Sequence, residues 1–411
     1  MRPIVLFEDA GHANLQPLLY WRSLPELRIG RKIVLDRTAQ RLGSAVCGVW
    51  TRAWIAAVAA QRCGAPANQP LGDDGVLVNA RWLAGGDVCT AEAPCVGTVD
   101  GEVAYIACDA RLSERLEPEI MLDAARRDAA LRGVTRVDAG GAFIRYPWDV
   151  ISRLAALLEE DWRETDAGVE SAVDARSMMG PAERIHVGQR AVIHPAAVID
   201  ASAGPVFLSD DARVGAGAVV EGPIYVGPGT HIHPHAWLHG GNALGPVCRV
   251  GGELHGCIVQ GYTNKQHEGY LGHAYVGSWV NIGAGSVNSD LKNTYGNVRV
   301  PINRREVDTG LRFFGAIIAD HAKIGINVAL PTGAVVGAAA TISGSRGVAK
   351  FVPSLGWLTD DGLGRADAGR QLDAATRMMV RRGVDMSDEE VELFLAIEEH
   401  VKAYEAKGAT A

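Results

Sequence analysis

Aliphatic residues recur at every sixth position through the second half of the chain. Eight consecutive positions follow this period between residues 208 and 250, and it returns at 276–282 and 318–342. A period of six fits neither an α-helix nor an ordinary strand. It is typical of a parallel β-helix, in which each hexapeptide forms one side of a coil of about 18 residues. Since one coil cannot bury its own apolar side, the pattern predicts a stack of coils over residues 185–345.

The six-residue period breaks twice, at 250–276 and again at 282–318. Insertions in a solenoid form loops on one face, and such loops often carry function. The first break contains Lys265, His267 and Tyr270, and the second begins with a polar stretch that contains Lys292. We therefore expect functional residues at the breaks and scaffold residues where the period is regular.

The N-terminal part has a different pattern of short apolar runs. Strands are expected at 4–7, 45–50, 76–79 and 103–107, with a helical stretch at 51–61. Alternation of short strands with helices predicts an α/β layer with a largely parallel sheet. Helical spacing at 148–165 predicts a connecting helix, so the first domain is placed at residues 1–165.

Two further segments complete the expected organisation. Residues 166–184 are small, charged and irregular, which indicates a linker. Residues 346–411 form a C-terminal tail that is helical from about 366, with an amphipathic pattern. We expect this tail to cap the β-helix.

Composition narrows the class of protein. A net charge of −8 among 411 residues gives no overall basic character for nucleic acid binding. There is no apolar run of 18 residues and no signal-peptide core, so we expect a cytoplasmic protein that does not enter a membrane. The seven cysteines form no Cys-x-x-Cys pair and are expected to be reduced thiols.

Residues 245–293 carry the most specific motifs. They include Gly-Tyr-Thr-Asn-Lys-Gln-His at 261–267, His-Glu-Gly-Tyr-Leu-Gly at 267–272 and Asn-Ile-Gly-Ala-Gly at 281–285. These motifs resemble the acetyltransferase half of the bifunctional N-acetylglucosamine-1-phosphate uridylyltransferase/glucosamine-1-phosphate acetyltransferase family. The N-terminal segment 15–30 and the tail at 377–383 are similar to a divergent branch of putative sugar nucleotidyltransferases within it. The resemblance covers nearly the whole chain.

The resemblance implies a fold and a set of site residues. The fold is a nucleotide-diphospho-sugar-transferase-like α/β domain, a left-handed parallel β-helix and a helical tail. His267 corresponds to the catalytic base of acetyl-CoA-dependent N-acylation, a task that suits an imidazole. Where the family has a serine near the thioester, this chain has Ile326. The resemblance also places Tyr270 and Asn281 at the amino-sugar 1-phosphate and Ala284 at acetyl-CoA. Arg249 and Lys265 are candidates for the phosphate, because fixed cations complement a sugar 1-phosphate. Lys292 is a further candidate for the substrate; alternatively it is a solvated residue of its polar loop. The family is usually trimeric, so a homotrimer is expected.

Four histidines lie close together in the regular coils, and the first three of them alternate with other residues. The positions are His231, His233, His235 and His239. The alternation suggests a metal site, but hexapeptide corners would scatter these side chains. We therefore interpret them as surface or stacking residues.

Nucleotidyl transfer in the first domain requires groups that bind phosphates, and Mg²⁺ held by carboxylates. The loop Phe-Glu-Asp-Ala-Gly-His-Ala at 7–13 differs from the glycine-rich phosphate loop of the family. The early basic residues Arg22, Arg28 and Lys32 are candidates for the phosphates of a nucleoside triphosphate, with UTP expected. Alternatively they form a solvated basic loop. The metal ligands are unknown; Asp73, Asp74 and Asp109 are possible carboxylates, and adjacent aspartates more often make a turn.

Three hypotheses follow. The first is an enzyme of nucleotide-sugar biosynthesis that transfers an acyl group in the β-helix and a nucleotidyl group in the N-terminal domain. The second is a nucleotidyltransferase whose β-helix is only a trimerisation stem. The third is a non-catalytic scaffold that binds sugar nucleotides.

Overall fold

The structure is a computed structural model that describes residues 2–72, 74–86, 88, 92–163, 167–344 and 347–405. Contacts divide the chain into two compact units. The α/β unit comprises Met1–Leu27, Lys32–Tyr146 and Asp388–Ala396. The β-helix unit comprises Arg28–Arg31, Pro147–Ser387 and Ile397–Ala411.

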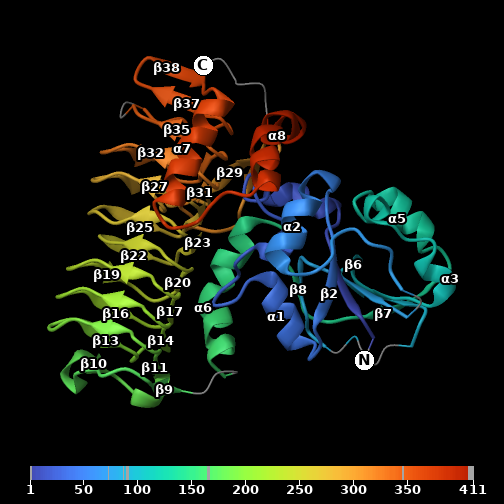
Figure 1. The fold of residues 1–411 in the computed structure, drawn as a ribbon, viewed down its shortest axis with the longest axis horizontal. Helices are drawn as coiled ribbons and strands as arrows, with labels where there is room; N and C mark the ends of the chain where they lie inside the picture. Colours follow the sequence, from blue (N-terminus) through green and yellow to red (C-terminus); the bar gives the residue numbers. More distant parts are fainter. Residues whose placement is uncertain are drawn as a thin grey trace. The chain divides into compact units, whose positions relative to one another are not determined.

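The α/β unit is built on a six-stranded sheet (Figure 1). Its order is β2 (Val46–Trp50), β1 (Ile4–Phe7), β3 (Val76–Asn79), β6 (Glu102–Ala107), β5 (Cys95–Val99) and β7 (Thr135–Asp138). The first three strands are parallel, but β6 runs antiparallel to both β3 and β5. The four expected strands are confirmed, whereas the sheet is mixed. The reason is the turn at Asp100-Gly101, where both residues have positive φ, as a tight β5–β6 hairpin requires.

Short helices surround this sheet. They are α1 (Val34–Arg41), α2 (Ala56–Cys63), α3 (Ala110–Ser113), α4 (Pro118–Met121) and α5 (Ala124–Ala130). A separate small antiparallel pair is formed by β4 (Trp82–Leu83) and β8 (Ala142–Phe143). Apolar side chains of β1, β3, β5 and β6 form a buried core with α3 and α4.

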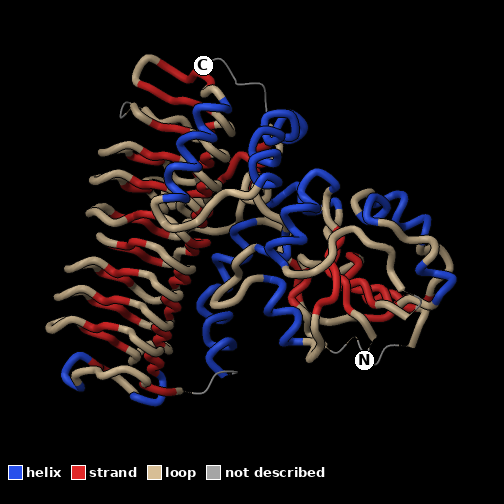
Figure 2. Tube along the Cα trace, viewed as in Figure 1, coloured by secondary structure: helices blue, strands red, loops and turns tan. Residues whose placement is uncertain are grey.

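The β-helix unit is a parallel solenoid with three faces, visible as a regular stack of coils in Figures 1 and 2. Face 1 contains β36 (Phe351–Val352), β34 (Ala334–Val336), β31 (Ala316–Ile318), β26 (Tyr275–Ser278), β23 (Ile258–Gly261), β20 (Asn242–Leu244), β17 (Ile224–Val226), β14 (Val206–Leu208), β11 (Ile185–Val187) and β9 (Gly168–Val169). Face 2 contains β10 (Met178–Met179), β13 (Val198–Asp200), β16 (Val219–Glu221), β19 (Trp237–Leu238), β22 (Glu253–His255) and β25 (Tyr270–Gly272).

Face 3 carries the ladder that later positions the site. It contains β12 (Val192–Ile193), β15 (Arg213–Val214), β18 (His231–Ile232), β21 (Arg249–Val250), β24 (Asn264–Lys265), β27 (Asn281–Ile282), β32 (Lys323–Ile324), β35 (Thr341–Ile342), β37 (Gly356–Thr359) and β38 (Gly362–Arg365). Two small sheets, β28 (Val287–Asn288) with β33 (Ala329–Leu330) and β29 (Arg299–Ile302) with β30 (Arg305–Asp308), come from the second break and the coil above it.

The six-residue period is explained by the interior of the coils. Periodic aliphatic residues such as Val214, Ile232 and Leu238 are at most 2% exposed and form one continuous core. Each of them pairs in register with the equivalent residue of a neighbouring coil. The parallel solenoid expected from the sequence is thus confirmed.

Three helices complete the second half of the chain. Helix α6 (Pro147–Arg163) buries the apolar stripe of Leu154, Leu157 and Leu158 and contacts β17 and β20. Helix α7 (Ala368–Val380) covers the C-terminal rungs of face 3, where the Lys323 Nζ lies 3.3 Å from the Met378 sulfur. Helix α8 (Asp388–Tyr404) follows it. The expected helical tail is confirmed.

The structure differs from the expected boundaries in three places. Within 167–184, β9 pairs with β11 and β10 pairs with β13, so this segment forms the first rungs instead of a linker. Beyond residue 345, β36 and β37 continue the ladders of faces 1 and 3. The connecting helix α6 belongs to the β-helix unit, because its apolar stripe packs on face 1.

In the described residues no helix combines the length and apolarity needed to cross a membrane. The described cysteines are all free thiols; Cys89 lies outside the described residues.

Candidate functional site

The first break in the period is a shortened coil. Rungs β15, β18 and β21 pair at intervals of eighteen positions, but Arg249 of β21 pairs with Asn264, only fifteen positions later. The shorter coil brings Lys265 into register with Val250, in the interior column of aliphatic residues. The break therefore alters the inside of the solenoid as well as its surface.

Lys265 lies inside the coil. Its side chain is 2% exposed, and its Nζ donates to the carbonyl oxygens of Gly251 at 3.1 Å and His267 at 2.6 Å. Burial lowers the pKa of the Lys265 ammonium to about 8. Its charge made Lys265 a candidate for a substrate phosphate. The structure instead directs the ammonium inward, where it binds the backbone of the corner that carries His267.

His267 is exposed at the corner between faces 3 and 2. Its ring Nε2 lies 3.2 Å from the Gln266 Nε2. The corners of the next coils lie directly beside it: the Gly285 amide donates to the Glu268 carbonyl oxygen at 3.2 Å, and the Asn327 amide donates to that of Ala284 at 2.8 Å. The structure thus brings the expected base and the expected acyl-CoA position onto one edge of the solenoid.

Ile326 lies on the same edge, one coil beyond Ala284. Its side chain is 66% exposed, which is unusual for an isoleucine. An exposed aliphatic group at this place offers an apolar contact to a ligand that runs along the edge.

Polar side chains form a column on face 3 next to His267. Arg249, Asn264 and Asn281 occupy successive rungs, and the Asn264 Nδ2 donates to the Asn281 Oδ1 at 3.4 Å. After α7 the chain returns to this column, where Arg382 donates to the Asn264 Oδ1 at 2.5 Å. The Arg249 Nη1 donates to the carbonyl oxygens of Gly229 and Cys248 at 3.0 and 2.9 Å. Two guanidinium groups and two amides therefore flank the corner.

Tyr270 lies across the corner on face 2. Its hydroxyl donates to the Asp290 Oδ2 at 2.7 Å, and the His273 Nδ1 lies 2.8 Å from the same oxygen. Burial and the hydrogen bond to Asp290 raise the pKa of the Tyr270 hydroxyl. Burial opposes ionisation of Asp290, but its bonds to His273 and Tyr270 prevail and lower its pKa. Asp290 is therefore a carboxylate that holds two rings in place.

Lys292 belongs to the polar loop of the second break. It is partly buried, and its Nζ donates to the carbonyl oxygen of Asn297 in the same loop. Of the residues expected in the β-helix, the structure gathers His267, Arg249, Asn281 and Ala284 at one edge. Tyr270 lies on the adjoining face, Lys292 in its own loop and Lys265 in the interior.

In the α/β unit, polar residues follow the ends of the three parallel strands. Glu8 follows β1 and is fully buried. It accepts from the Thr51 hydroxyl at 2.6 Å, from the Arg52 Nε at 3.0 Å and from the Leu24 amide at 2.7 Å. Burial raises the pKa of Glu8, but Arg52 more than compensates and lowers it to about 2.

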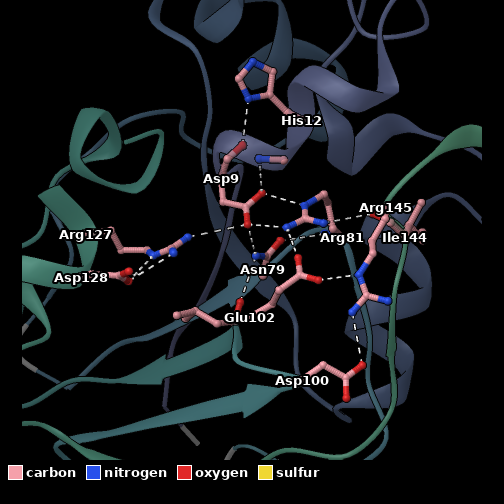
Figure 3. A network of polar contacts seen from close by, with 12 residues as sticks. Asp9, His12, Asn79, Arg81, Asp100, Glu102, Arg127, Asp128, Ile144 and Arg145 are labelled. Atoms are coloured by element: carbon pink, nitrogen blue, oxygen red, sulfur yellow. Dashed lines mark hydrogen bonds and ion pairs between the residues drawn. The ribbon is translucent and has the colours of Figure 1, made fainter. Parts of the chain in front are cut away.

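Asp9 forms the centre of a second network at the same edge (Figure 3). Arg81, which follows β3, donates to its two oxygens at 2.7 and 2.6 Å, and Asn79 donates at 2.9 Å. Arg81 also donates to Glu102 at 2.7 Å, and Arg145 donates to Glu102 at 2.6 Å. Burial raises the pKa of Asp9, but its hydrogen bonds to Arg81 prevail and lower it. The edge is thus a network in which arginines neutralise the carboxylates.

The three basic residues expected at a triphosphate belong to both units. Arg28 belongs to the β-helix unit, where its backbone amide donates to the Gln260 Oε1 at 3.0 Å and its guanidinium lies over the Tyr225 ring. Arg22 and Lys32 belong to the α/β unit; Arg22 is buried and Lys32 is half-buried. Because Arg28 is tied to face 1, it serves the packing of the β-helix unit.

The possible metal carboxylates have structural partners. Asp74 forms an ion pair with Arg2 at 2.8 Å, and Asp109 caps α3 by accepting from the Leu112 amide at 2.8 Å. Asp73 lies outside the described residues. In the part of the chain that the structure describes, no three His, Cys, Asp or Glu side chains are arranged to hold a metal ion.

Comparison with known proteins gives matches to sugar nucleotidyltransferases and to bifunctional proteins. Residues 4–168 match the family model described as sugar nucleotidyl transferase. The bifunctional protein GlmU of Synechococcus elongatus is 27% identical over 42% of this chain and 37% of its own length. The bifunctional sugar-1-phosphate nucleotidylyltransferase/acetyltransferase of Sulfurisphaera tokodaii is 30% identical over 34% of this chain and 35% of its own length. GlmU of Heliobacterium modesticaldum is 26% identical over 50% and 44%. The chain is therefore similar to GlmU-type bifunctional proteins, at low identity and over part of its length.

The chain spans less than half of the length of the curated relatives it matches. As the resemblance implied, this GlmU-like chain combines an α/β unit with a solenoid.

Sequence reasoning missed three side chains near this edge of the solenoid. His233 lies close enough to His267 for their charges to interact. Arg382 comes from the tail, more than a hundred residues after Asn264, and no local signal indicates it. Arg213 precedes an interior valine just as Arg249 does, and this recurrence at a multiple of eighteen could have been read from the sequence.

Proposed function

We propose that the β-helix unit transfers an acyl group from acyl-CoA, with acetyl-CoA expected, to the amine of an amino-sugar 1-phosphate. The observation that supports this most strongly is an exposed histidine, His267, on the edge where Arg249, Asn281 and Ala284 also lie. The relative named as a bifunctional nucleotidylyltransferase/acetyltransferase supports a transferase of this kind.

In the proposed reaction His267 is the general base. Its unprotonated ring nitrogen takes a proton from the amine while the amine nitrogen attacks the thioester carbonyl carbon. The carbon–sulfur bond then breaks, and the CoA thiolate takes the proton from the imidazolium. One amide bond is formed and one thioester bond is lost, so atoms and electrons balance.

The phosphate of the acceptor needs fixed cations nearby. Arg249 and Arg382 both lie beside Asn264, and a guanidinium binds a phosphate through two parallel N–H donors. Asn281 on the next rung offers an amide to sugar hydroxyls. Lys265 is assigned a positioning role, because it holds the carbonyl group of His267 from inside.

We also propose a nucleotidyl transfer from a nucleoside triphosphate, with UTP expected, to a sugar 1-phosphate in the α/β unit. The family match over 4–168 supports it, and so do the polar residues at the carboxyl ends of β1, β2 and β3, where open α/β sheets bind ligands.

The carboxylates at this edge do not fit a Mg²⁺ site. Asp9 accepts bonds from Arg81 and Asn79, and Glu8 from Arg52 and Thr51. A divalent cation would have to displace an arginine from each of them. No step is therefore assigned to Mg²⁺ at this edge.

The homotrimer and the cytoplasmic location stay proposals that rest on the resemblance and the sequence. Sedimentation equilibrium of the full chain tests the trimer. A monomer at micromolar concentration would contradict it.

The acyl transfer is tested by release of free thiol from acetyl-CoA with glucosamine 1-phosphate as acceptor. We expect His267→Ala to lower kcat by about a hundredfold and to keep the assembly state. His235→Asn is the matched control, because this exposed corner histidine has a φ of 61° that asparagine tolerates. Thiol release by His267→Ala at the wild-type rate would remove the assigned base. Silence of the wild type with several amino-sugar phosphates would remove the acyl transfer itself.

A further inference from the structure

A basic pocket lies on face 3 beyond the proposed site, toward the N-terminal end of the solenoid. Arg213, His231 and Arg249 occupy three successive rungs of the same outward column. His194 and His233 come directly after β12 and β18, at the corner. The pocket has a volume of about 250 Å³, and its polar side chains are those of Arg213, His194, His231 and His233.

The positive charge in this pocket is not neutralised from within. Its lining contains no aspartate or glutamate among the described residues. Asp211 is close enough to Arg213 for their charges to interact, but its carboxylate is already paired with Arg190 at 2.7 Å. Face 3 thus differs from the edge of the α/β sheet, where Arg52 and Arg81 have carboxylate partners.

Burial and the nearby arginines keep two histidines of this pocket, His231 and His233, uncharged. Burial, together with the charges of Arg249 and Arg213, lowers the pKa of His231 to about 4. Burial and then Arg249 lower the pKa of His233. At neutral pH both rings are uncharged and can donate one hydrogen bond each, beside the guanidinium groups of Arg213 and Arg249.

A single sugar phosphate does not account for this arrangement. In the proposed function, Arg249 and Arg382 already provide two guanidinium groups for one phosphate. Neighbouring strands are about 4.8 Å apart, so Arg213 lies about 10 Å from Arg249 along the ladder, with His231 between them. These groups extend the anion-binding surface by two further rungs.

We propose that this pocket is a second phosphate subsite, which binds the diphosphate group of a substrate through Arg213, His231 and His233. Arg213 supplies the charge, and the neutral imidazoles donate hydrogen bonds. This proposal rests on the proposed function. It adds to that function that one of the two substrates bound on face 3 is a diphosphate ester.

Two substrates carry such a group. One is the diphosphate of coenzyme A; the other is a nucleoside diphospho-sugar, which would be the acyl acceptor in place of a sugar 1-phosphate. Coenzyme A carries the acyl group and the nucleoside diphospho-sugar would be the acceptor of the same reaction, so a diphosphate of either one fits this pocket. The test therefore contains one arm for each.

The test measures binding to the full chain by titration calorimetry, without turnover. The ligands are inorganic pyrophosphate, coenzyme A, a uridine diphospho-sugar and, as the single-phosphate reference, glucosamine 1-phosphate. The variant is Arg213→Gln, an exposed position where folding is not at risk. The control is Arg176→Gln, whose side chain is 90% exposed and forms an ion pair with Asp174.

We expect Arg213→Gln to weaken pyrophosphate binding about tenfold and glucosamine 1-phosphate binding less than about twofold. A parallel loss for coenzyme A alone identifies the donor, and a loss for the uridine diphospho-sugar alone identifies the acceptor. Equal losses for all four ligands, or no loss for pyrophosphate, would overturn the subsite. A wild type that binds pyrophosphate through Arg213 but releases no thiol would keep the subsite and contradict the acyl transfer.

Discussion

Replacing Lys265 by methionine should change how the stability of the β-helix depends on pH. The Lys265 side chain is 2% exposed and occupies the interior column between Val250 and Ile282. Burial lowers the pKa of its ammonium from the usual 10.5 to about 8. Methionine has a similar length and no charge, so it fits the same place in the core.

The direction of this pH dependence follows from the number of protons that the folded and unfolded states bind. Between pH 8 and 10.5 the unfolded lysine is protonated and the folded one is largely neutral. The unfolded state then binds more protons, and stability increases with pH. The drop in pKa from 10.5 to about 8 corresponds to about 3 kcal/mol, since a tenfold change in an equilibrium constant is worth about 1.4 kcal/mol. Relative to the Lys265→Met variant, the wild type should therefore gain up to about 3 kcal/mol of stability as the pH rises through this window.

The assay is urea unfolding of the two proteins at regular steps of pH across this window. All other titrating groups are the same in the two proteins, so their effects cancel in the difference between the two free energies of unfolding. Ile282→Met is the control, because it changes packing in the same column without removing a charge. Its difference from the wild type should be flat with pH. A flat difference for Lys265→Met as well would refute the interior position of the ammonium.

Three further variants test other parts of the structure. In the wild type, the pKa of Glu8 is lowered to about 2, so Glu8 contributes up to about 3 kcal/mol of stability that is lost as the pH falls from about 4.5 to about 2. Glu8→Gln should lack this contribution, which acid titration of tryptophan fluorescence measures. An acid midpoint equal to that of the wild type would contradict the prediction. Asp290→Asn should lower kcat/KM for acyl transfer about tenfold, since Tyr270 and His273 lose their shared carboxylate; unchanged kinetics would show that these rings do not serve the site. Ile326→Ser should raise KM for acyl-CoA about fivefold at constant kcat, because an apolar contact worth about 1 kcal/mol is lost; an effect on kcat alone would argue against that contact.

The regular part of the solenoid could be predicted because its interior tolerates little besides aliphatic residues. Val214, Ile232 and Leu238 are buried in one continuous core, and the period in the sequence reflects that core directly. The same regularity predicts which neighbours face outward, so Arg213 and His231 could have been assigned to face 3 from spacing alone.

The shortened coil could not be predicted in the same way. Where the six-residue period breaks, the sequence no longer shows which side chains point into the coil and which point outward. The sequence pattern therefore suggested a surface cation at Lys265, although the loss of three residues places it in register with Val250. Contacts over long sequence distances were equally hidden, as with Arg382 beside Asn264 and Arg28 beside Gln260.

The two units differ in how much binding free energy their charges can offer to a phosphate. At the edge of the α/β sheet, Arg52 and Arg81 already bind buried carboxylates. A phosphate that recruited either arginine would leave a buried carboxylate unpaired, at a cost of about 3–5 kcal/mol.

On the described part of face 3, the arginines at the pocket are not paired with buried carboxylates. Arg213, His231 and Arg249 lie on successive rungs, and no aspartate or glutamate is found among the described residues that line the pocket there. An incoming phosphate relieves the repulsion between the Arg213 and Arg249 guanidinium groups, and it forms charge-assisted hydrogen bonds with them. Any nucleotide bound by the α/β unit must therefore be held by groups other than Arg52 and Arg81, whereas a phosphate that reaches face 3 would meet two guanidinium groups without breaking an ion pair to a buried carboxylate.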